Sequence, residues 1–264
     1  MANGRAQVVE CARDFIRNPD RDIRHATIRL IMSHIAQRMQ AVNERISRAA
    51  TAASRDPRDI RLLAVSKTFP IDAIVEASTA GQRAFGENYV QEALDKIVAL
   101  RHLPDLEWHM IGPLQSNKCG VVATHFSWVH TVDRTKIAAR LSALRPESFP
   151  PLQVCVQVNI SGESSKSGVR PDDAMALSRS IASMLRITLR GLMGIAGLDV
   201  HPDVVRGQFR MLRELRDDLV RDGHSLDTLS MGMSGDLDAA IAEGATLVRV
   251  GSAIFGERDV KVIP

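Results

Sequence analysis

The sequence has few cysteines, few aromatic residues and no long apolar run, and each shortage excludes a class of protein. Its three cysteines, Cys11, Cys119 and Cys155, lie far apart and form no CxxC pair, which argues against a disulfide framework and against a zinc site. Aromatic residues make up only 4% of the chain and do not interleave with a dense basic run, so no nucleic-acid surface is indicated. This cysteine usage fits a reducing cytoplasm.

No apolar run approaches the roughly 20 residues of a transmembrane helix, and the N-terminus has no hydrophobic signal core, so we expect no membrane association. Residues 1–32 nevertheless differ from the rest, because they mix several arginines with acids such as Glu10 and Asp14. That mixture is unlike a transit peptide, which is poor in acids. We expect an N-terminal extension over residues 1–32, helical or frayed, followed by one domain over residues 33–264.

The 264 residues, 45% of them hydrophobic and 25% charged, are typical of a globular protein with a sizeable core. After a first helix over 33–50, short apolar runs alternate with amphipathic segments, as in βαβ units with parallel strands. We expect strands at 62–66, 83–85, 108–111, 128–131, 153–159, 188–195, 226–231 and 247–250. The intervening helices are expected at 71–80, 88–100, 134–144, 172–185, 203–222 and 236–243, with Asp133 and Ser234 as N-caps.

Eight such units without a Pro/Gly-rich linker predict an α/β protein with a single (β/α)₈ TIM barrel. A doubly wound open sheet is the rival fold. Such a sheet normally carries a glycine-rich phosphate turn after its first strand, whereas Lys67-Thr68-Phe69-Pro70 stands there. Turns of the phosphate-binding type, Ser234-Gly235 and Gly251-Ser252, instead follow the last two predicted strands, which favours the barrel.

Lys67 stands where the first predicted strand ends, on the same side as Leu63 and Val65. A lysine in such a place most often extends into solvent. At the carboxyl mouth of a barrel, partial desolvation would instead favour the neutral amine that forms a Schiff base with a carbonyl.

Two turns near the C-terminus also follow predicted strands and could complement this lysine in one site. Ser234-Gly235 and Gly251-Ser252 each follow an apolar strand and precede a helix, an arrangement that directs backbone N–H groups at a phosphate. Arg249 shares a side of the last strand with Gly251, and it either pairs with an acid of a neighbouring strand or binds an anionic or pyridine-like ligand. Together these features suggest a phosphorylated aldehyde held as an imine.

Three further polar residues fall on or near the predicted rim. Asn88 and Asn159 are interpreted as loop organisers that could also bind a ligand hydroxyl, and His109 as a satisfied core histidine. The eight histidines show no metal-ligating spacing, so we expect no metal site.

Several motifs in a fixed order support a family resemblance. They are Leu63-Ala64-Val65-Ser66-Lys67-Thr68, Phe85-Gly86-Glu87-Asn88-Tyr89, Ile111-Gly112-Pro113-Leu114-Gln115-Ser116-Asn117-Lys118, Ser165-Lys166-Ser167-Gly168, Ser230-Met231-Gly232-Met233-Ser234 and Val248-Arg249-Val250-Gly251-Ser252. With these motifs, the chain resembles the YggS/PROSC family of pyridoxal phosphate homeostasis proteins over residues 35–258. It departs from the family at Phe69, where many members have a second lysine.

The resemblance implies an alanine-racemase-like barrel that binds pyridoxal 5'-phosphate (PLP) as an imine on Lys67. It places Ser234, Gly251 and Ser252 on the phosphate cradle and Arg249 opposite the pyridine nitrogen. An arginine there keeps that nitrogen unprotonated and weakens the cofactor as an electron sink. The expected cofactor-binding residues are Lys67, Asn88, Ser234, Gly235, Arg249, Gly251 and Ser252.

The implied role is PLP homeostasis, meaning storage and delivery of the cofactor and control of free aldehyde, without strong catalytic turnover. Apo PLP-dependent enzymes would be the recipients, Lys166 would assist transfer, and a monomer is expected. The alternative is a PLP-dependent racemase or decarboxylase, which generally needs a second acid or base from another domain; only 14 residues follow Val250, so none is expected. A class I aldolase and a non-catalytic interaction barrel also remain open.

Overall fold

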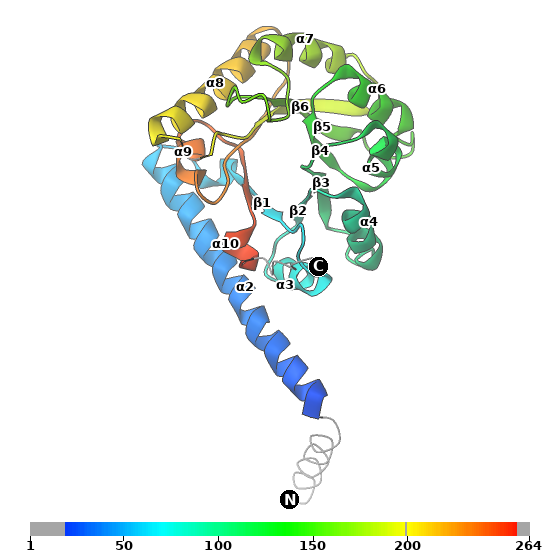
Figure 1. Ribbon diagram of the computed structural model, residues 1–264, viewed down its shortest axis with the longest axis vertical. Coiled ribbons are helices and arrows are strands. Elements are labelled where there is room, and N and C mark those ends of the chain that lie inside the picture. The colour runs from blue at the N-terminus through cyan, green and yellow to red at the C-terminus, as the bar shows by residue number, and fades with distance from the viewer. Residues whose placement is uncertain (1–18, 199, 258–264) are drawn as a thin grey trace, which may run out of the picture.

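Eight parallel strands, β1 to β8, follow one another in chain order and close into a barrel, with β8 beside β1. The structure, a computed structural model, describes residues 19–198 and 200–257, with side chains from residue 34 onward. Helices surround the barrel (Figure 1). The predicted (β/α)₈ fold is therefore confirmed, and the doubly wound sheet is excluded.

Each predicted strand is found within two residues of its expected ends. The strands are β1 (Arg61–Val65), β2 (Ala84–Glu87), β3 (Glu107–Met110), β4 (Trp128–Val132), β5 (Leu152–Val158), β6 (Ile187–Gly194), β7 (Thr228–Ser230) and β8 (Leu247–Val250). Most of their residues are buried, as expected when helices cover the outside of a parallel barrel.

The helices that follow the strands also lie where the amphipathic segments predict them. They are α3 (Ile71–Thr79), α4 (Val90–Ala99), α5 (Cys119–His125), α6 (Thr135–Leu144), α7 (Pro171–Ala182), α8 (Pro202–Arg221), α9 (Leu237–Ala242) and α10 (Ser252–Phe255), with 3₁₀ turns η1 (Pro57–Asp59) and η2 (Ser116–Lys118). The sequence analysis assigns no helix to the segment that forms α5.

Both predicted N-caps are wrong. In α6 the cap position is held by Arg134, and the carboxylate of Asp133 contacts the Arg134 guanidinium at 2.5 Å. In α9 the cap position is held by Asp236, whose carboxylate accepts a hydrogen bond from the N–H of Met233 at 2.5 Å. The turn before α9 is thus closed by an acid, which leaves the Ser234 side chain out of the cap.

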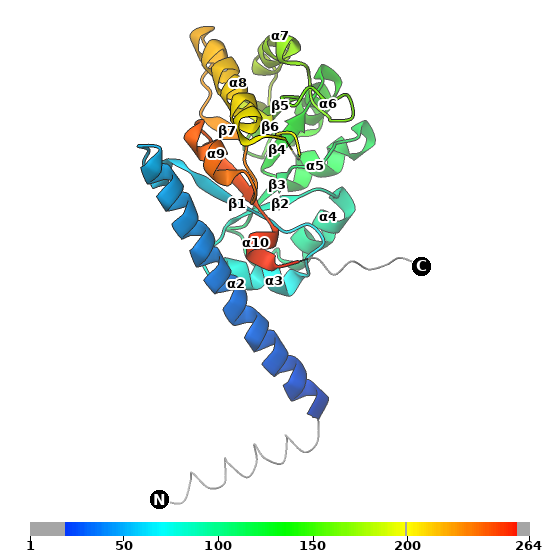
Figure 2. The ribbon, with the colours of Figure 1, turned by 60° about the vertical axis from the view of Figure 1, so that its left-hand side comes forward.

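Helix α2 (Pro19–Ala52) packs along α3, α9 and α10, and its N-terminal part extends away from the barrel (Figure 2). Apolar residues three or four positions apart form its buried face: Ile35, Met39, Val42, Ile46 and Ala50. The helix runs unbroken past residue 32, so the division into an extension and a barrel domain stays a prediction. Neither α2 nor any other helix in the described part of the chain combines the length and hydrophobicity that a membrane span needs.

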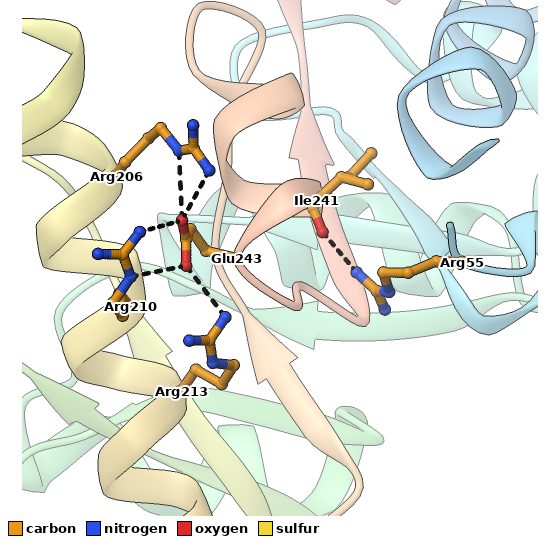
Figure 3. A network of polar contacts seen from close by, with 6 residues as sticks. All are labelled: Arg55, Arg206, Arg210, Arg213, Ile241 and Glu243. Carbon is orange, nitrogen blue, oxygen red and sulfur yellow. Dashed lines mark hydrogen bonds and ion pairs between the residues drawn. The ribbon is translucent and has the colours of Figure 1, made fainter. Parts of the chain in front are cut away.

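Three arginines of α8 anchor the end of α9 through one carboxylate (Figure 3). Arg206, Arg210 and Arg213 lie at 3.1, 3.0 and 3.0 Å from the oxygens of Glu243, whose side chain is 3% exposed. Burial would raise the pKa of Glu243, but the arginines lower it. Arg55 adds a hydrogen bond to the carbonyl of Ile241 at 2.8 Å. These contacts fix α9, and with it the Ser234-Gly235 turn.

Candidate functional site

The predicted cofactor-binding residues all line one cavity, of about 270 Å³, at the carboxyl ends of the strands. That end of a (β/α)₈ barrel is where active sites are built. The lining residues are Val65, Lys67, Asn88, Ile111, Ile195, Met233, Ser234, Gly235, Arg249, Gly251 and Ser252. Parallel pairing of β1 with β8 brings Lys67 close to Gly251 and Ser252, although more than 180 residues separate them in the sequence.

Lys67 lies on a tight turn immediately after β1. The N–H of Phe69 donates to the carbonyl of Ser66 at 3.1 Å, and Thr68 adopts a positive φ of 67°, an uncommon conformation for a residue with a side chain. The N–H of Thr68 donates to Glu92 at 2.6 Å. These bonds hold the turn, and the half-buried Lys67 side chain enters the cavity from it.

A buried ion pair supports this turn from behind. The Lys96 ammonium lies 2.8 Å from Oε1 of Glu87 and 2.6 Å from Glu92, and it donates to the carbonyl of Ser66 at 2.7 Å. The Ser66 hydroxyl donates to the same Glu87 oxygen at 2.6 Å. Burial raises the pKa of Glu87, and the adjacent Lys96 partly offsets that effect. Charge pairing therefore fixes the residue before Lys67.

Sequence reasoning did not find this ion pair. Glu87 belongs to a loop motif of the sequence, whereas Lys96 stands in an amphipathic segment that predicts only a helix. The available signal was the Glu92–Lys96 spacing of four residues, which places the two side chains on one face of α4. The contact of Lys96 with Glu87 depends on how α4 packs against the barrel, and no local pattern reports that.

Arg249 lies on β8 beneath the cavity and is buried, with 5% of its surface exposed. Its Nη1 donates to the carbonyl and the hydroxyl of Ser230 at 2.6 and 2.9 Å, and its Nη2 donates to the carbonyl of Gly194 at 3.0 Å. Burial lowers the pKa of Arg249 to about 10, so the guanidinium remains charged at neutral pH. The hydrogen-bond partners given by the structure are uncharged oxygens, not the acid of a neighbouring strand.

The two small-residue turns form another part of the cavity wall. A Cβ at Gly235 would meet no atom within 4 Å, so open space lies in front of this residue. At Gly251 a Cβ would lie 3.2 Å from the carbonyl oxygen of Val65, so glycine permits the close approach of β8 to β1. The first amides of α10 have no acceptor within their own helix, and exposed Ser252 adds a hydroxyl.

Arg45 of α2 fixes the first of these turns from outside. Its Nη1 donates to the carbonyl of Ser234 at 2.7 Å, and its guanidinium pairs with Asp238 at 2.8 Å. The N-terminal helix thus contacts the cavity wall directly, a role that no motif in the sequence indicated.

The remaining polar candidates, Asn88, Asn159 and His109, lie in different places, the first two in loops and the third in the barrel interior. Asn88 lines the cavity, and its backbone packs so closely on Gly112 that no side chain fits there. Asn159 organises its own loop, because its amide donates to the carbonyls of Glu163 and Lys166 at 2.8 and 3.3 Å. His109 does not line this cavity and is fully buried, as predicted, but only its Nδ1 has a hydrogen-bond partner, so the prediction of a satisfied histidine is half right.

A smaller cavity of about 200 Å³ adjoins the first, and both are lined by Asn88, Ile111 and Ile195. Lys166 lies in the smaller one. Its ammonium pairs with Glu163 at 2.9 Å and donates to the carbonyl of Ala196 at 3.0 Å. The loop that carries Lys166 therefore lines the cavity next to the main one.

The donor set of the main cavity suits an anionic ligand with a carbonyl group. It contains an amine, a buried guanidinium, two hydroxyls and the amides of two glycine-containing turns, and no carboxylate is among the described lining residues. In the described part of the chain there is also no cluster of His, Cys, Asp or Glu that could hold a metal ion.

Comparison with known proteins agrees with this geometry. The family described as alanine racemase, N-terminal domain, matches residues 37–259. The chain is 55% identical over 228 residues to the pyridoxal phosphate homeostasis protein of Pseudomonas aeruginosa, covering 86% of this chain and 97% of that protein. It is 51% identical over 234 residues to the protein of the same name from Escherichia coli K12, covering 86% and 98%.

A solved structure is similar as well. PipY of Synechococcus elongatus, in a structure with PLP bound, matches with a TM-score of 0.74 at 38% sequence identity, covering 84% of this chain and all of that one.

Proposed function

The chain belongs to the family of pyridoxal phosphate homeostasis proteins, and from that premise we propose that it binds PLP as an imine on Lys67 and serves in storing and delivering this cofactor. The observation that carries the proposal is the meeting of Lys67 with the two phosphate-type turns in one cavity. An amine and a phosphate cradle in the same cavity are what a phosphorylated aldehyde requires.

Each lining residue then has a definite task. Ser234, Gly235, Gly251 and Ser252 bind the phosphate through amides and hydroxyls, and Asn88 hydrogen-bonds the ring hydroxyl. Arg249, a donor held below the cavity by Ser230 and Gly194, faces the pyridine nitrogen. PLP supplies electron withdrawal when its ring nitrogen is protonated, and a guanidinium, which only donates, opposes that protonation.

We therefore propose a carrier without strong catalytic turnover. A racemase needs a second acid or base across the cofactor, and the side chains described around the cavity include neither a carboxylate nor a tyrosine; Tyr89 is 57% exposed and does not line it. The rival function is an amino-acid racemase or decarboxylase. Racemisation or decarboxylation with a turnover rate of about 1 s⁻¹ or more, as in ordinary enzymes, would establish this rival function.

Lys166 is proposed to assist the release of the cofactor. It lies in the adjoining cavity, where its amine could receive the aldehyde side of the ligand as it leaves Lys67. The rate of PLP delivery to an apo-enzyme should fall several-fold in Lys166→Ala, while the affinity for PLP stays within about twofold. An unchanged delivery rate would remove this role.

The proposal is tested by adding PLP to the cofactor-free protein and following its absorbance. The wild type and the control Lys136→Ala, altered on the exposed face of α6, should become yellow with saturation at one PLP per chain. Lys67→Ala should remain folded by circular dichroism and show only the spectrum of free PLP. Saturable colour in Lys67→Ala, or none in the wild type, would contradict the proposal.

A further inference from the structure

A continuous row of buried polar side chains crosses the barrel from Arg249 to the beginning of β3. The Arg249 guanidinium donates to Oγ of Ser230 at 2.9 Å, and that oxygen lies 2.8 Å from Nδ1 of His130. Nε2 of His130 lies 2.9 Å from Nδ1 of His109, and Nε2 of His109 lies 3.3 Å from Oε1 of Glu107. Of these side chains only Arg249 lines the main cavity, and the proposed function gives the others no task.

The two ends of this row have fixed roles. A guanidinium has only N–H donors, so Ser230 must accept from Arg249. At the other end burial would raise the pKa of Glu107, but contacts with His109 and Arg61 lower it to about 2, so Glu107 is a carboxylate and can only accept. Arg61 donates to its second oxygen at 2.8 Å.

Only one placement of the protons agrees with both ends. Nε2 of His109 lies outside hydrogen-bond geometry but within ion-pair distance of Glu107, so a proton on that nitrogen is attracted whereas a lone pair would be repelled. Nδ1 of His109 then accepts from Nε2 of His130, and Nδ1 of His130 accepts from the Ser230 hydroxyl. The opposite placement would leave the Ser230 proton without a partner in the row and direct a lone pair at Glu107.

The surroundings keep both imidazoles neutral. Both histidines are fully buried, and the ring of Trp128 stacks on His109 with centroids 5.4 Å apart. Burial lowers the pKa of His109 against the opposing effect of Glu107. Burial also lowers the pKa of His130 well below its usual value, and the positive charges of Arg249 and Arg61 act in the same direction.

We propose that Ser230, His130 and His109 form a one-directional hydrogen-bonded relay that positions the Arg249 guanidinium and is oriented by the nearby Glu107 carboxylate, with both histidines held as neutral Nε2–H tautomers. Every dipole in the relay points its acceptor toward Arg249 and its donor toward Glu107. The carboxylate therefore acts on the cavity floor through oriented groups, although it lies at the amino end of β3. Ser230, His130 and His109 are positioning residues, since none of them lines the cavity.

The first test does not involve the cofactor and therefore stands whether or not the proposed function holds. Long-range ¹H–¹⁵N spectra of the full chain, stripped of ligand, should show both His109 and His130 as neutral Nε2–H tautomers at pH 7. Single His109→Gln and His130→Gln variants assign the two signals. An Nδ1–H tautomer, or a doubly protonated ring, at either residue would overturn the relay.

The second test rests on the proposed function and measures binding of PLP. Ser230→Ala removes the hydroxyl that joins Arg249 to His130, and we expect PLP affinity to fall about 3- to 10-fold, the usual effect of one hydrogen bond. The matched control is Ser178→Ala, since Ser178 is equally buried and its hydroxyl has no partner in the described structure. Equal affinities in the two variants would contradict a role for the relay in the cavity.

The absorbance of the PLP complex distinguishes failure of the relay from failure of the proposed function. If the wild type forms no coloured complex, the proposed function is wrong. The relay is then still tested by the tautomers of His109 and His130 in the NMR spectra. If the wild type is coloured, the Ser230→Ala complex should show a shifted absorption maximum, because its guanidinium is less well fixed. The maximum of Ser178→Ala should coincide with that of the wild type, and an identical maximum in Ser230→Ala would count against the relay.

Discussion

The lysine side and the phosphate side of the cavity are held in place in different ways. On the lysine side, the turn after β1 rests on Glu87 and Lys96, whose side chains are 0% and 6% exposed and form an ion pair of 2.8 Å. On the phosphate side, the turns at Ser234-Gly235 and Gly251-Ser252 consist of backbone and small side chains, and Gly235 and Ser252 are exposed. The ion pair that supports the first turn, Arg45 with Asp238, is also more exposed, with side chains 36% and 61% exposed.

This difference matches what the proposed function would require of each side. An amine that forms a covalent bond must be kept in one position, and buried charges fix the backbone beside it. A phosphate needs several open donors that water can occupy when the ligand leaves. A site that binds and releases its ligand combines a fixed attachment point with an accessible cradle.

The largest expected effect comes from breaking the ion pair of the lysine side. Lys96→Met leaves the Glu87 carboxylate buried without its partner, and we expect the free energy of unfolding to fall by about 3–5 kcal/mol. Urea denaturation followed by circular dichroism measures the change. The control Lys136→Met, at an exposed position of α6, should change it by no more than about 0.5 kcal/mol.

The double variant Glu87→Gln with Lys96→Met sharpens this result. With both charges removed, the loss should be clearly smaller than the sum of the two single losses. Additive losses, or a Lys96→Met stability close to that of the control, would show that the ion pair does not support the lysine side.

A smaller effect concerns the barrel floor, where the charged Glu107 side chain is 29% exposed. Because the folded-state pKa of Glu107, about 2, lies below its ordinary value of 4.5, this carboxylate stabilises the fold above pH 4.5 and that contribution is lost as the pH falls toward 2. Between pH 6 and pH 3 the wild type should lose about 2 kcal/mol more unfolding free energy than Glu107→Gln. Parallel pH profiles of the two proteins would contradict the assigned role.

The smallest effect on the fold is expected on the phosphate side. Ser234→Ala and Ser252→Ala should leave the free energy of unfolding within about 0.5 kcal/mol of the wild type, because neither hydroxyl supports the barrel. Each should weaken PLP binding about 10-fold through loss of a charge-assisted hydrogen bond, measured by absorbance titration. Ser183→Ala, exposed at the end of α7, should alter neither quantity. If either serine variant lost stability but kept its affinity for PLP, the phosphate side would support the fold and not the ligand, which contradicts the comparison.

The same division explains what the sequence could predict. Strands, and the small-residue turns that follow them, are local patterns, so the eight strands and the positions of these turns could be predicted from the sequence alone. Phosphate binding at the turns stays a prediction. Lys67 could be placed because it ends a strand. Family motifs then joined these local features into one site.

The supports behind the site could not be predicted, because they join distant elements. Lys96 reaches Glu87 from α4, and Ser230 and His130 meet across the barrel although 100 residues separate them. Such contacts depend on strand register and helix packing, which no local pattern contains. The two N-caps were mistaken for a different reason, because the competing contacts are local: Asp133 bonds Arg134, and Asp236 closes the turn that Ser234 was expected to cap.

The central claim is that Lys67 is the attachment point of the cofactor, and reduction of the PLP-loaded protein with borohydride tests it most directly. Reduction makes the bond permanent, and peptide mass spectrometry then locates the added mass. The account predicts this mass on the peptide that contains Lys67, at one per chain. Its appearance on Lys166 or another lysine, or on none, would contradict the account.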